Sequence, residues 1–259
     1  MPPPRRLSIA RAERWRRRWD LQQERYVLDR EARFRSLLYW VRAVVGSRPR
    51  CLDLGCGTGA VTERILRRFP RARVVAVDYD PVTRRLGEVA LARYRSRVTW
   101  VDADLRSPRW KDAIPPGRYD AALSSTALHW LTGPQLGRLY RDLGRLLRPG
   151  GIFLNADGIA FDRLSRRLAE AERAARLDGT KGRRVRAPGE AWTEWWDAIA
   201  REPGLTEEMR VHRERFPHEH LGTPTPDLPG HVRRLRRAGF REVELVYSRR
   251  RSRVLAAVR

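Results

Sequence analysis

The chain has 259 residues, of which 41% are hydrophobic and 33% are charged. This composition excludes an intrinsically disordered chain, and the length favours one α/β domain with a large insertion. The formal net charge of +24 comes almost wholly from arginine, because Lys111 and Lys181 are the only lysines. Such a charge suggests a nucleic acid or another anionic partner. The arginines occur in almost every segment, which favours a coding bias over a dedicated polyanion-binding surface.

The sequence shows no pattern of a secreted or membrane protein. The opening MPPPRRLSIA lacks the apolar core of a secretory signal, and nowhere do about 18 apolar residues run together. We therefore expect a cytoplasmic protein without a membrane partner. Cys51 and Cys56 have no second pair with which to form a metal site or a disulfide framework, so we expect buried thiols.

Residues 10–45 predict one or two helices, because apolar residues such as Trp15, Trp19 and Phe34 recur near a period of 3.6. From residue 50 onward, short apolar runs alternate with helical stretches, which is typical of β-α-β units and a parallel sheet. The predicted strands are 51–54, 74–77, 98–101, 119–123 and 152–155, with predicted helices near 58–69, 82–94 and 134–147.

The segment 157–228 interrupts this alternation, since it carries five prolines and helical patches but no clear strand. It is followed by a predicted helix at 231–238 and by two apolar runs, 242–247 and 254–258. A short basic turn separates these runs, so we expect a terminal antiparallel hairpin. The predicted units are an N-terminal helical cap (1–48), a core domain (49–156 with 229–259) and a helical insertion (157–228).

The stretch GCGTG, residues 55–59, follows a predicted strand and precedes a predicted helix. Its glycines allow a ligand to lie against the backbone at the carboxyl end of the sheet. A dinucleotide fingerprint has its third glycine one position later and binds an anionic pyrophosphate. Here carboxylates stand at the strand ends, in a chain with only 31 acids against 55 bases: Asp53, Asp78, Asp80, Asp102 and Asp104. We therefore expect a cationic or hydroxyl-rich ligand.

Five motifs occur in order along residues 50–258: LDLGCGTG, VVAVDYD, VTWVDADL, YDAALSSTALHWL and LLRPGGIFL. Together they resemble the class I S-adenosylmethionine-dependent methyltransferases of the small-molecule type. The resemblance implies a Rossmann-like α/β fold with a mostly parallel seven-stranded sheet and a terminal antiparallel hairpin. It also implies an N-terminal helical extension, an α-helical insertion before the last two strands, and S-adenosyl-L-methionine as the cofactor.

The resemblance assigns roles to the residues that match its first two motifs. Gly55 and Gly57 would pass close to the methionine part of the cofactor, and Asp53 would assist its ammonium group. Asp78 ends the second predicted strand and would bind the ribose hydroxyls, for which a carboxylate is a suitable double acceptor. For each aspartate, a helix cap or a surface acid is the structural alternative.

The third and fourth motifs complete the predicted cofactor site. Asp104 and the Leu105 amide would contact the adenine edge, and Ser124 would present its backbone oxygen near the sulfonium. Asp80 and Asp102 are expected to be supporting or exposed residues. The full set of predicted cofactor-binding residues is Asp53, Gly55, Cys56, Gly57, Gly59, Asp78, Tyr79, Asp104, Leu105, Ser124, Tyr26 and Arg30.

Members of the resembled family use the N-terminal helices and the insertion to cover the cofactor and hold the acceptor. Tyr26 and Arg30 are the candidates for closing over the sulfonium, with packing or surface salt links as the alternative. A second candidate contribution is the insertion's aromatic stripe of Trp192, Trp195, Trp196 and Ile199 at i, i+3, i+4 and i+7, for which core packing is favoured.

His129 is the catalytic candidate, as a base or an anchor for the acceptor, and structural packing behind the fourth strand is its alternative. The ALHWL segment around it is similar to trans-aconitate methyltransferase-like proteins, which methylate carboxylates or related groups. A carboxylate is already ionised and needs orienting cations rather than a base. We therefore expect methyl transfer to a small molecule, with a carboxylate or another acidic metabolite as the first candidate.

Two other functions stay open. An RNA- or nucleic-acid-directed methyltransferase would use the basic surface, but the segment 124–127 lacks the Asn/Asp-Pro-Pro-aromatic box of enzymes that methylate base amines. A cofactor-binding regulator without turnover is the third possibility. His218 and His220 lie two apart, but no further cluster completes a metal shell, so no metal is expected. The oligomeric state, monomer or homodimer, is left open.

Overall fold

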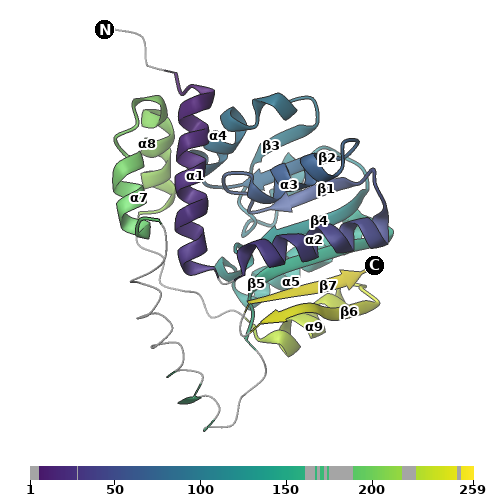
Figure 1. Ribbon diagram of the computed structural model, residues 1–259. Helices are drawn as coiled ribbons and strands as arrows, with labels where there is room; N and C mark the ends of the chain where they lie inside the picture. The colour runs from purple at the N-terminus through teal and green to yellow at the C-terminus, as the bar shows by residue number, and fades with distance from the viewer. Residues whose placement is uncertain are drawn as a thin grey trace.

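The computed structural model describes residues 6–27, 29–160, 167, 170, 171, 174, 189–217, 226–249 and 252–259. Its centre is a sheet with the strand order β3-β2-β1-β4-β5-β7-β6 (Figure 1). The strands are β1 (Arg50–Leu54), β2 (Arg73–Asp78), β3 (Val98–Asp102), β4 (Tyr119–Ser125), β5 (Leu147–Gly158), β6 (Glu242–Arg249) and β7 (Ser252–Val258). The first five run parallel, and β7 pairs antiparallel with both β5 and β6. The predicted sheet and terminal hairpin are thus confirmed.

Helices cover both faces of this sheet, as the apolar runs of its strands require. The helices are α1 (Ile9–Tyr26), α2 (Arg30–Val45), α3 (Ala60–Arg68), α4 (Pro81–Ala90), α5 (Gly133–Leu146), α7 (Trp192–Ile199), α8 (Thr206–Arg215) and α9 (Leu228–Arg237). Phe34 of α2 and Val61 of α3 join the apolar core on one face. Leu139 of α5 and Leu235 of α9 join the core on the other face.

Local sequence signals explain where several helices begin. Thr132 and Gln135 form a reciprocal capping box at the start of α5. The Asp80 carboxylate accepts hydrogen bonds from Val82 N and Thr83 N and so caps α4. Because this cap immediately follows β2, it holds the chain at the carboxyl end of that strand, where the predicted ribose-binding residue lies.

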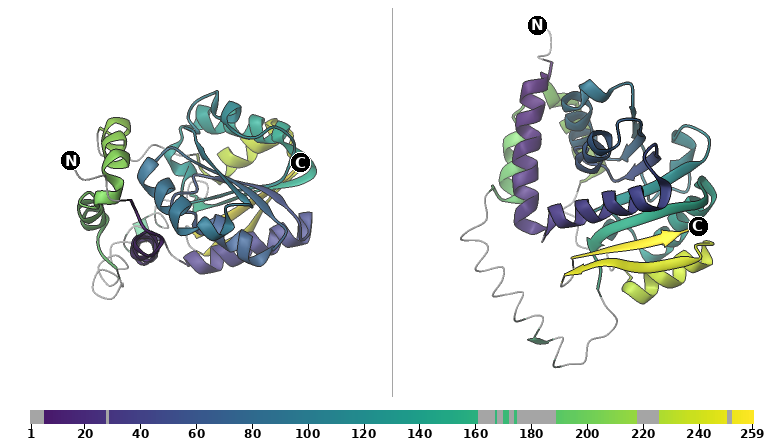
Figure 2. Two further views of the ribbon diagram at one scale, coloured as in Figure 1. Left: turned by 90° about the horizontal axis from the view of Figure 1, so that it is seen from above. Right: turned by 45° about the vertical axis from the view of Figure 1, so that its right-hand side comes forward.

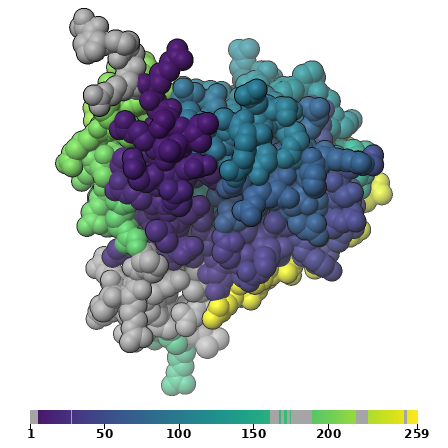
Figure 3. All heavy atoms as spheres, turned by 45° about the horizontal axis from the view of Figure 1, so that its top comes forward, coloured from purple at the N-terminus to yellow at the C-terminus, as the bar shows by residue number. Residues whose placement is uncertain are grey.

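The N-terminal helix α1 lies apart from the sheet and packs against α4 and against the insertion helix α7, while α8 packs directly on α4 (Figures 1 and 2). A third apolar cluster joins these elements and includes Trp15 of α1, Leu86 of α4 and Trp195 of α7. Trp195 and Ile199 are fully buried in it, so this part of the aromatic stripe is core packing. Figure 3 shows α1 wedged between the insertion and the core domain.

Helix α8 continues from this cluster to the carboxyl ends of β2 and β3. The Arg215 guanidinium donates to the Tyr79 carbonyl at 2.6 Å and to both oxygens of Asp102 at 2.7 and 3.0 Å. The insertion therefore lies against the same edge of the sheet as the glycine stretch. None of the helices in the described ranges has the length and apolar character needed to span a membrane.

Candidate active site

The glycine stretch forms a loop between β1 and α3. Gly55, Gly57 and Gly59 have φ angles of +70°, +51° and +78°, in the left-handed region that favours glycine. A Cβ built at Gly55 would overlap the Cβ of Ala127, whereas one at Gly57 would meet no atom within 4 Å. The loop is thus closed on the Gly55 side and open at Gly57, where a ligand has access to the backbone.

Asp78 lies against this open part of the loop. Its Oδ2 accepts a hydrogen bond from Gly57 N at 2.6 Å, and its Oδ1 accepts one from Asp80 N at 2.8 Å. Burial, helped by the neighbouring Asp80 carboxylate, raises the pKa of Asp78 to about 6. Each carboxylate oxygen has a second lone pair, so the predicted bonds to ribose hydroxyls are compatible with these two contacts.

Asp53 is buried behind the loop rather than at its surface. Its Oδ2 accepts hydrogen bonds from Thr62 N at 2.9 Å and from Thr62 Oγ1 at 2.6 Å, so it holds the first turn of α3. Burial raises the pKa of Asp53 to about 7, against the opposing effect of the bonds from Thr62. Its Oδ1 is also buried and has no hydrogen-bond partner among the described residues, which leaves it for a donor on a ligand.

The predicted adenine-binding residues have partners within the protein. Asp104 accepts hydrogen bonds from Arg106 N at 2.8 Å and from Arg106 Nε at 2.9 Å. The Leu105 side chain packs against the core of the sheet. The Tyr79 ring lies under the Arg215 guanidinium at 4.4 Å and beside the Phe216 ring at 5.7 Å. Tyr79 is therefore packed against the end of α8.

Three predicted residues support the loop from within. Ser124 is buried and donates from Oγ to the Leu54 carbonyl at 2.8 Å, which ties β4 to β1. Cys56 is buried, and burial raises the pKa of its thiol. Gly59 takes the N-cap position of α3 in the left-handed conformation. These contacts fix the shape of the loop, and the roles of these residues toward a cofactor stay predictions.

Tyr26 and Arg30 make their contacts with helices α1, α2 and α7. Tyr26 is 53% exposed, and its hydroxyl accepts a hydrogen bond from Trp192 N at 3.2 Å. Arg30 is buried, pairs with Asp20 at 2.7 Å and lies 4.8 Å from the Phe34 ring. These contacts are those of the packing and salt-link alternative, and the predicted role over the sulfonium stays untested.

His129 lies in a short 3₁₀ turn, Leu128–Trp130, beyond the carboxyl end of β4. Its Nδ1 is 3.0 Å from Asp157 Oδ1, and its backbone N donates to Asp157 Oδ2 at 3.3 Å. Burial disfavours charge on the imidazole, but the Asp157 carboxylate outweighs it and raises the pKa of His129. In the same way His129 outweighs the effect of burial and lowers the pKa of Asp157. The pair therefore favours an imidazolium beside a carboxylate.

Sequence reasoning missed Arg33, Thr126 and Asp157, which surround His129. Arg33 of α2 is 2% exposed and donates from Nη2 to Thr126 Oγ1 at 2.9 Å. Asp157 is the buried carboxylate that orients His129. Asp157 follows an apolar run at a strand's carboxyl end, a signal that could have found it. Arg33 has no such signal in a chain with arginine in nearly every segment.

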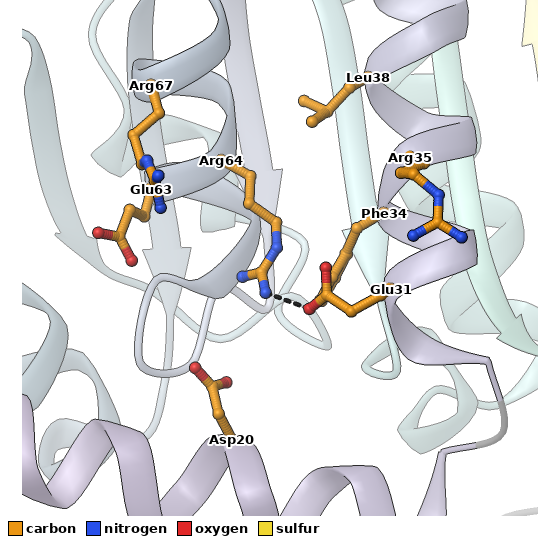
Figure 4. Close-up of a pocket in the computed structure, with 8 residues that line it drawn as sticks. All are labelled: Asp20, Glu31, Phe34, Arg35, Leu38, Glu63, Arg64 and Arg67. Atoms are coloured by element: carbon orange, nitrogen blue, oxygen red, sulfur yellow. Dashed lines mark hydrogen bonds and ion pairs between the residues drawn. The ribbon is translucent and has the colours of Figure 1, made fainter.

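A separate hollow of about 430 Å³ opens between α1, α2 and α3 (Figure 4). Phe34 and Leu38 form its apolar wall, and the Arg64 guanidinium bonds to Glu31 across it. Its remaining lining residues are charged: Asp20, Arg35, Glu63 and Arg67. None of the predicted cofactor-binding residues lines it, so it is distinct from the glycine-loop site.

The described part of the chain contains no group of three or more His, Cys, Asp or Glu side chains that could hold a metal ion. His218 and His220 lie outside the described residues.

The groups that suit S-adenosylmethionine lie at the glycine loop. They are the open backbone at Gly57, the Asp78 carboxylate and the orphaned Asp53 Oδ1, which fit a ligand that carries hydroxyl and ammonium donors.

Comparison with known families and curated proteins agrees with this geometry. The family model described as a methyltransferase domain matches residues 51–151. A trans-aconitate 2-methyltransferase from Azoarcus sp. (strain BH72) is 34% identical over 186 residues, which cover 70% of this chain and 67% of that protein. A malonyl-[acyl-carrier protein] O-methyltransferase from Halorhodospira halophila is 36% identical over 151 residues, which cover 54% of this chain and 46% of that protein. The matches thus span about half to two thirds of these relatives.

Solved structures share the fold. PigF with SAH, S-adenosylhomocysteine, gives a TM-score of 0.53 at 16% identity, covering 86% of this chain and 55% of that one. Human N-acetylserotonin methyltransferase in complex with SAM, S-adenosylmethionine, gives a TM-score of 0.52 at 16% identity, covering 97% of this chain and 56% of that one. At this identity the likeness extends to the fold alone.

Proposed function

Because this chain belongs to the class I S-adenosylmethionine-dependent methyltransferases of the small-molecule type, we propose that it transfers the methyl group to a carboxylate oxygen of a small acidic molecule. The observation that carries the proposal is the group of cations beside the glycine loop. His129 follows the carboxyl end of β4, Arg33 of α2 bonds to Thr126 there, and Ala127, between Thr126 and His129 in the sequence, lies against Gly55. An acceptor bound by these cations would lie next to the cofactor.

The named relatives support an acidic acceptor. The two relatives described above are named for trans-aconitate and for a malonyl group, each of which carries a carboxylate. Because these matches leave a third to a half of each relative uncovered, the acceptor of this chain is proposed from its own site. The site supplies cations where an acidic acceptor would need them.

Methyl transfer to a carboxylate makes modest demands on the protein. When bound, S-adenosylmethionine supplies a methyl group on a cationic sulfur; a carboxylate oxygen forms the new C–O bond while the C–S bond breaks and its electron pair stays on sulfur. No proton is released, so no base is needed, and alignment and exclusion of water are the main tasks. Here Asp78, which accepts a hydrogen bond from Gly57 N, would bind the sugar of the cofactor. Asp157 would keep the His129 imidazolium oriented toward the acceptor.

The flanking helices would close this site. We propose that residues 1–48 and 157–228 act as a cap and an acceptor-binding lid around the core domain, residues 49–156 and 229–259. The proposal is supported by α1, which packs between α4 and α7, and by Arg215, which reaches the ends of β2 and β3. Arg215 thus brings the insertion to the sheet edge that carries the glycine loop, and α1 joins the insertion to α4.

The test is methyl transfer from radiolabelled S-adenosylmethionine to a panel of small carboxylic acids, each paired with its amide. We expect label to enter the acids as base-labile methyl esters and to stay out of the amides. Transfer to amines, phenols or alcohols at equal rates would contradict a carboxylate acceptor. Absence of S-adenosylhomocysteine binding in calorimetry would contradict the predicted cofactor site itself.

A nucleic acid is the alternative acceptor, and the net charge of +24 is what favours it. Several arginines are paired within the fold, since Arg215 binds Asp102, Arg18 binds Glu190 and Arg148 binds Asp120, but the net charge already counts such pairs as neutral. Methylation of RNA that weakens steeply with added salt would support this alternative. An affinity for RNA that does not change with salt would remove it.

A further inference from the structure

Arg33 is a buried cation without a buried anion of its own. Its side chain is 2% exposed, and its hydrogen bond goes to a neutral group, the Thr126 hydroxyl at 2.9 Å. Its Nε is buried and has no hydrogen-bond partner, and no carboxylate lies within ion-pair distance, among the residues that the structure describes. A guanidinium in this state is costly unless an anion joins it.

No acid near Arg33 in the described part of the chain is free to neutralise it. The nearby acids are engaged elsewhere, because Asp157 accepts from His129 and Gly158, and Asp29 pairs with Arg249. Burial lowers the pKa of Arg33, and the charge of Asp157 offsets this only in part. With an imidazolium at His129, the cluster of Arg33, His129 and Asp157 carries one net positive charge.

The cluster is also directly connected to the glycine loop. Thr126, which orients Arg33, adopts a left-handed φ of +58°, a conformation that is strained for a β-branched residue. This bend brings the next residue, Ala127, against Gly55. Thr126, which holds Arg33, is therefore the direct neighbour in sequence of Ala127, the residue that closes the glycine loop at Gly55.

We propose that Arg33 binds a carboxylate of the acceptor other than the one that is methylated, and so selects acceptors with at least two carboxylates. A carboxylate held in the fork of a guanidinium has both oxygens engaged, which makes it a poor nucleophile. The reacting carboxylate must instead face the methyl group over the loop. This inference rests on the proposed carboxylate acceptor and adds the residue that recognises its second acidic group.

The test compares dicarboxylates of three to six carbons with their half-amides as acceptors, in the wild type and in three variants. Arg33→Gln removes the charge, Arg33→Lys keeps the charge without the fork, and Arg35→Gln is the control on the exposed side of the same helix. In the wild type we expect the dicarboxylates to be preferred at least about tenfold in kcat/KM. In Arg33→Gln the KM for dicarboxylates should rise about 30-fold, with kcat and S-adenosylhomocysteine affinity little changed.

The readouts separate recognition from folding. The Arg33→Lys variant should lie between the wild type and Arg33→Gln, and Arg35→Gln should match the wild type. An unchanged KM in Arg33→Gln, with the cofactor still bound, would overturn the proposal and leave Arg33 a packing residue. Should Arg33→Gln fail to bind the cofactor, Thr126→Val decides, because it keeps the Arg33 side chain and removes the hydroxyl to which Arg33 donates. A raised dicarboxylate KM supports the proposal, and an unchanged one overturns it.

A different result identifies failure of the proposed function. A wild type that methylates only non-acidic acceptors contradicts carboxylate methylation before any variant is made. A wild type that methylates monocarboxylates as well as dicarboxylates keeps the proposed function and rejects the role of Arg33. The two statements therefore fail on different measurements.

Discussion

The two halves of the candidate site, at the carboxyl edge of the sheet, carry opposite charges. At the ends of β1 and β2 and after β3 the chain places Asp53, Asp78 and Asp104. After β4 it places His129, and Arg33 of α2 bonds to Thr126 in the same segment. A cationic methyl donor suits the first half, and an anionic acceptor suits the second. Under the proposed function, one continuous edge would align two oppositely charged reactants, and alignment is the main demand of methyl transfer.

The two halves also differ in how far apart in sequence their parts lie. In the acidic half, the Asp78 carboxylate at the end of β2 accepts hydrogen bonds from Gly57 N, 21 residues earlier in the chain, and from Asp80 N, two residues later. In the basic half, Arg33 reaches Thr126 across 93 residues. The first half is built from turns directly after strands, and the second from a helix brought in by the fold.

The largest expected effect is on stability, and it comes from substitutions in the glycine loop, where Gly55 of the acidic half touches Ala127 of the basic half. Gly55→Ala should destabilise the protein by about 3 kcal/mol, because a left-handed alanine and an overlap with Ala127 each cost about 1–2 kcal/mol. Gly57→Ala should lose only about 1 kcal/mol, since its Cβ meets open space, but should weaken S-adenosylhomocysteine binding more than about tenfold. Thermal unfolding and calorimetry distinguish these outcomes. Equal losses of stability in both variants would contradict the open loop at Gly57.

The acidic half was largely predictable from the sequence. The glycine spacing and the acids that follow apolar runs locate the loop, Asp78 and Asp104 at one edge, because parallel strands end on the same side of a sheet. The seven strands and their antiparallel ending were likewise predicted, since period and turn residues are local properties of the chain. The sequence left two roles open for Asp53, a ligand contact or a helix cap, because the choice depends on the direction of its side chain. In the structure, one of its oxygens accepts a hydrogen bond from Thr62 N.

The basic half was not predictable in the same way. Arg33 differs from its neighbours Arg30 and Arg35 only in the direction in which it projects from α2, and nothing in an arginine-rich sequence marks that direction. Likewise, Arg215 reaches Asp102 over 113 residues. Such contacts depend on how helices dock on the sheet, so tertiary packing rather than local pattern decides them.

The charge of the acidic half can be tested through pH. The pKa of Asp78 is about 6 in the protein, raised by burial and by Asp80, while Arg84 acts in the opposite direction. Ribose hydroxyls donate best to the ionised carboxylate, so cofactor binding should favour ionisation and release a proton. Affinity should therefore be full above about pH 7 and fall below about pH 6, by at most about tenfold per pH unit.

Calorimetry of S-adenosylhomocysteine between pH 5 and pH 8 measures this dependence, with Asp78→Asn as the comparison. That variant should bind more weakly at pH 8 and lose most of the slope. Asp53, with a pKa of about 7, is the residual source of any slope that remains. A wild-type affinity that is constant over this range, or a full slope in Asp78→Asn, would show that the Asp78 carboxylate does not contact the ligand.

The smallest expected effect is on the rate at which S-adenosylhomocysteine is released, and it concerns helix α8, which lies against the acidic half. Arg215 holds α8 to Asp102 and to the Tyr79 carbonyl, and a partly exposed pair of this kind is worth about 0.5–1 kcal/mol. Arg215→Gln should therefore speed the release of S-adenosylhomocysteine about threefold and leave the KM of the acceptor unchanged.

Arg210→Gln is the matched control, because Arg210 pairs with Glu207 and Glu214 on α8 itself. Stopped-flow tryptophan fluorescence can follow the release, since Trp196 stacks on His212 of α8 at 4.2 Å. If acceptor KM rose in Arg215→Gln instead, α8 would serve the basic half, and the division of the edge into two separately covered halves would be wrong.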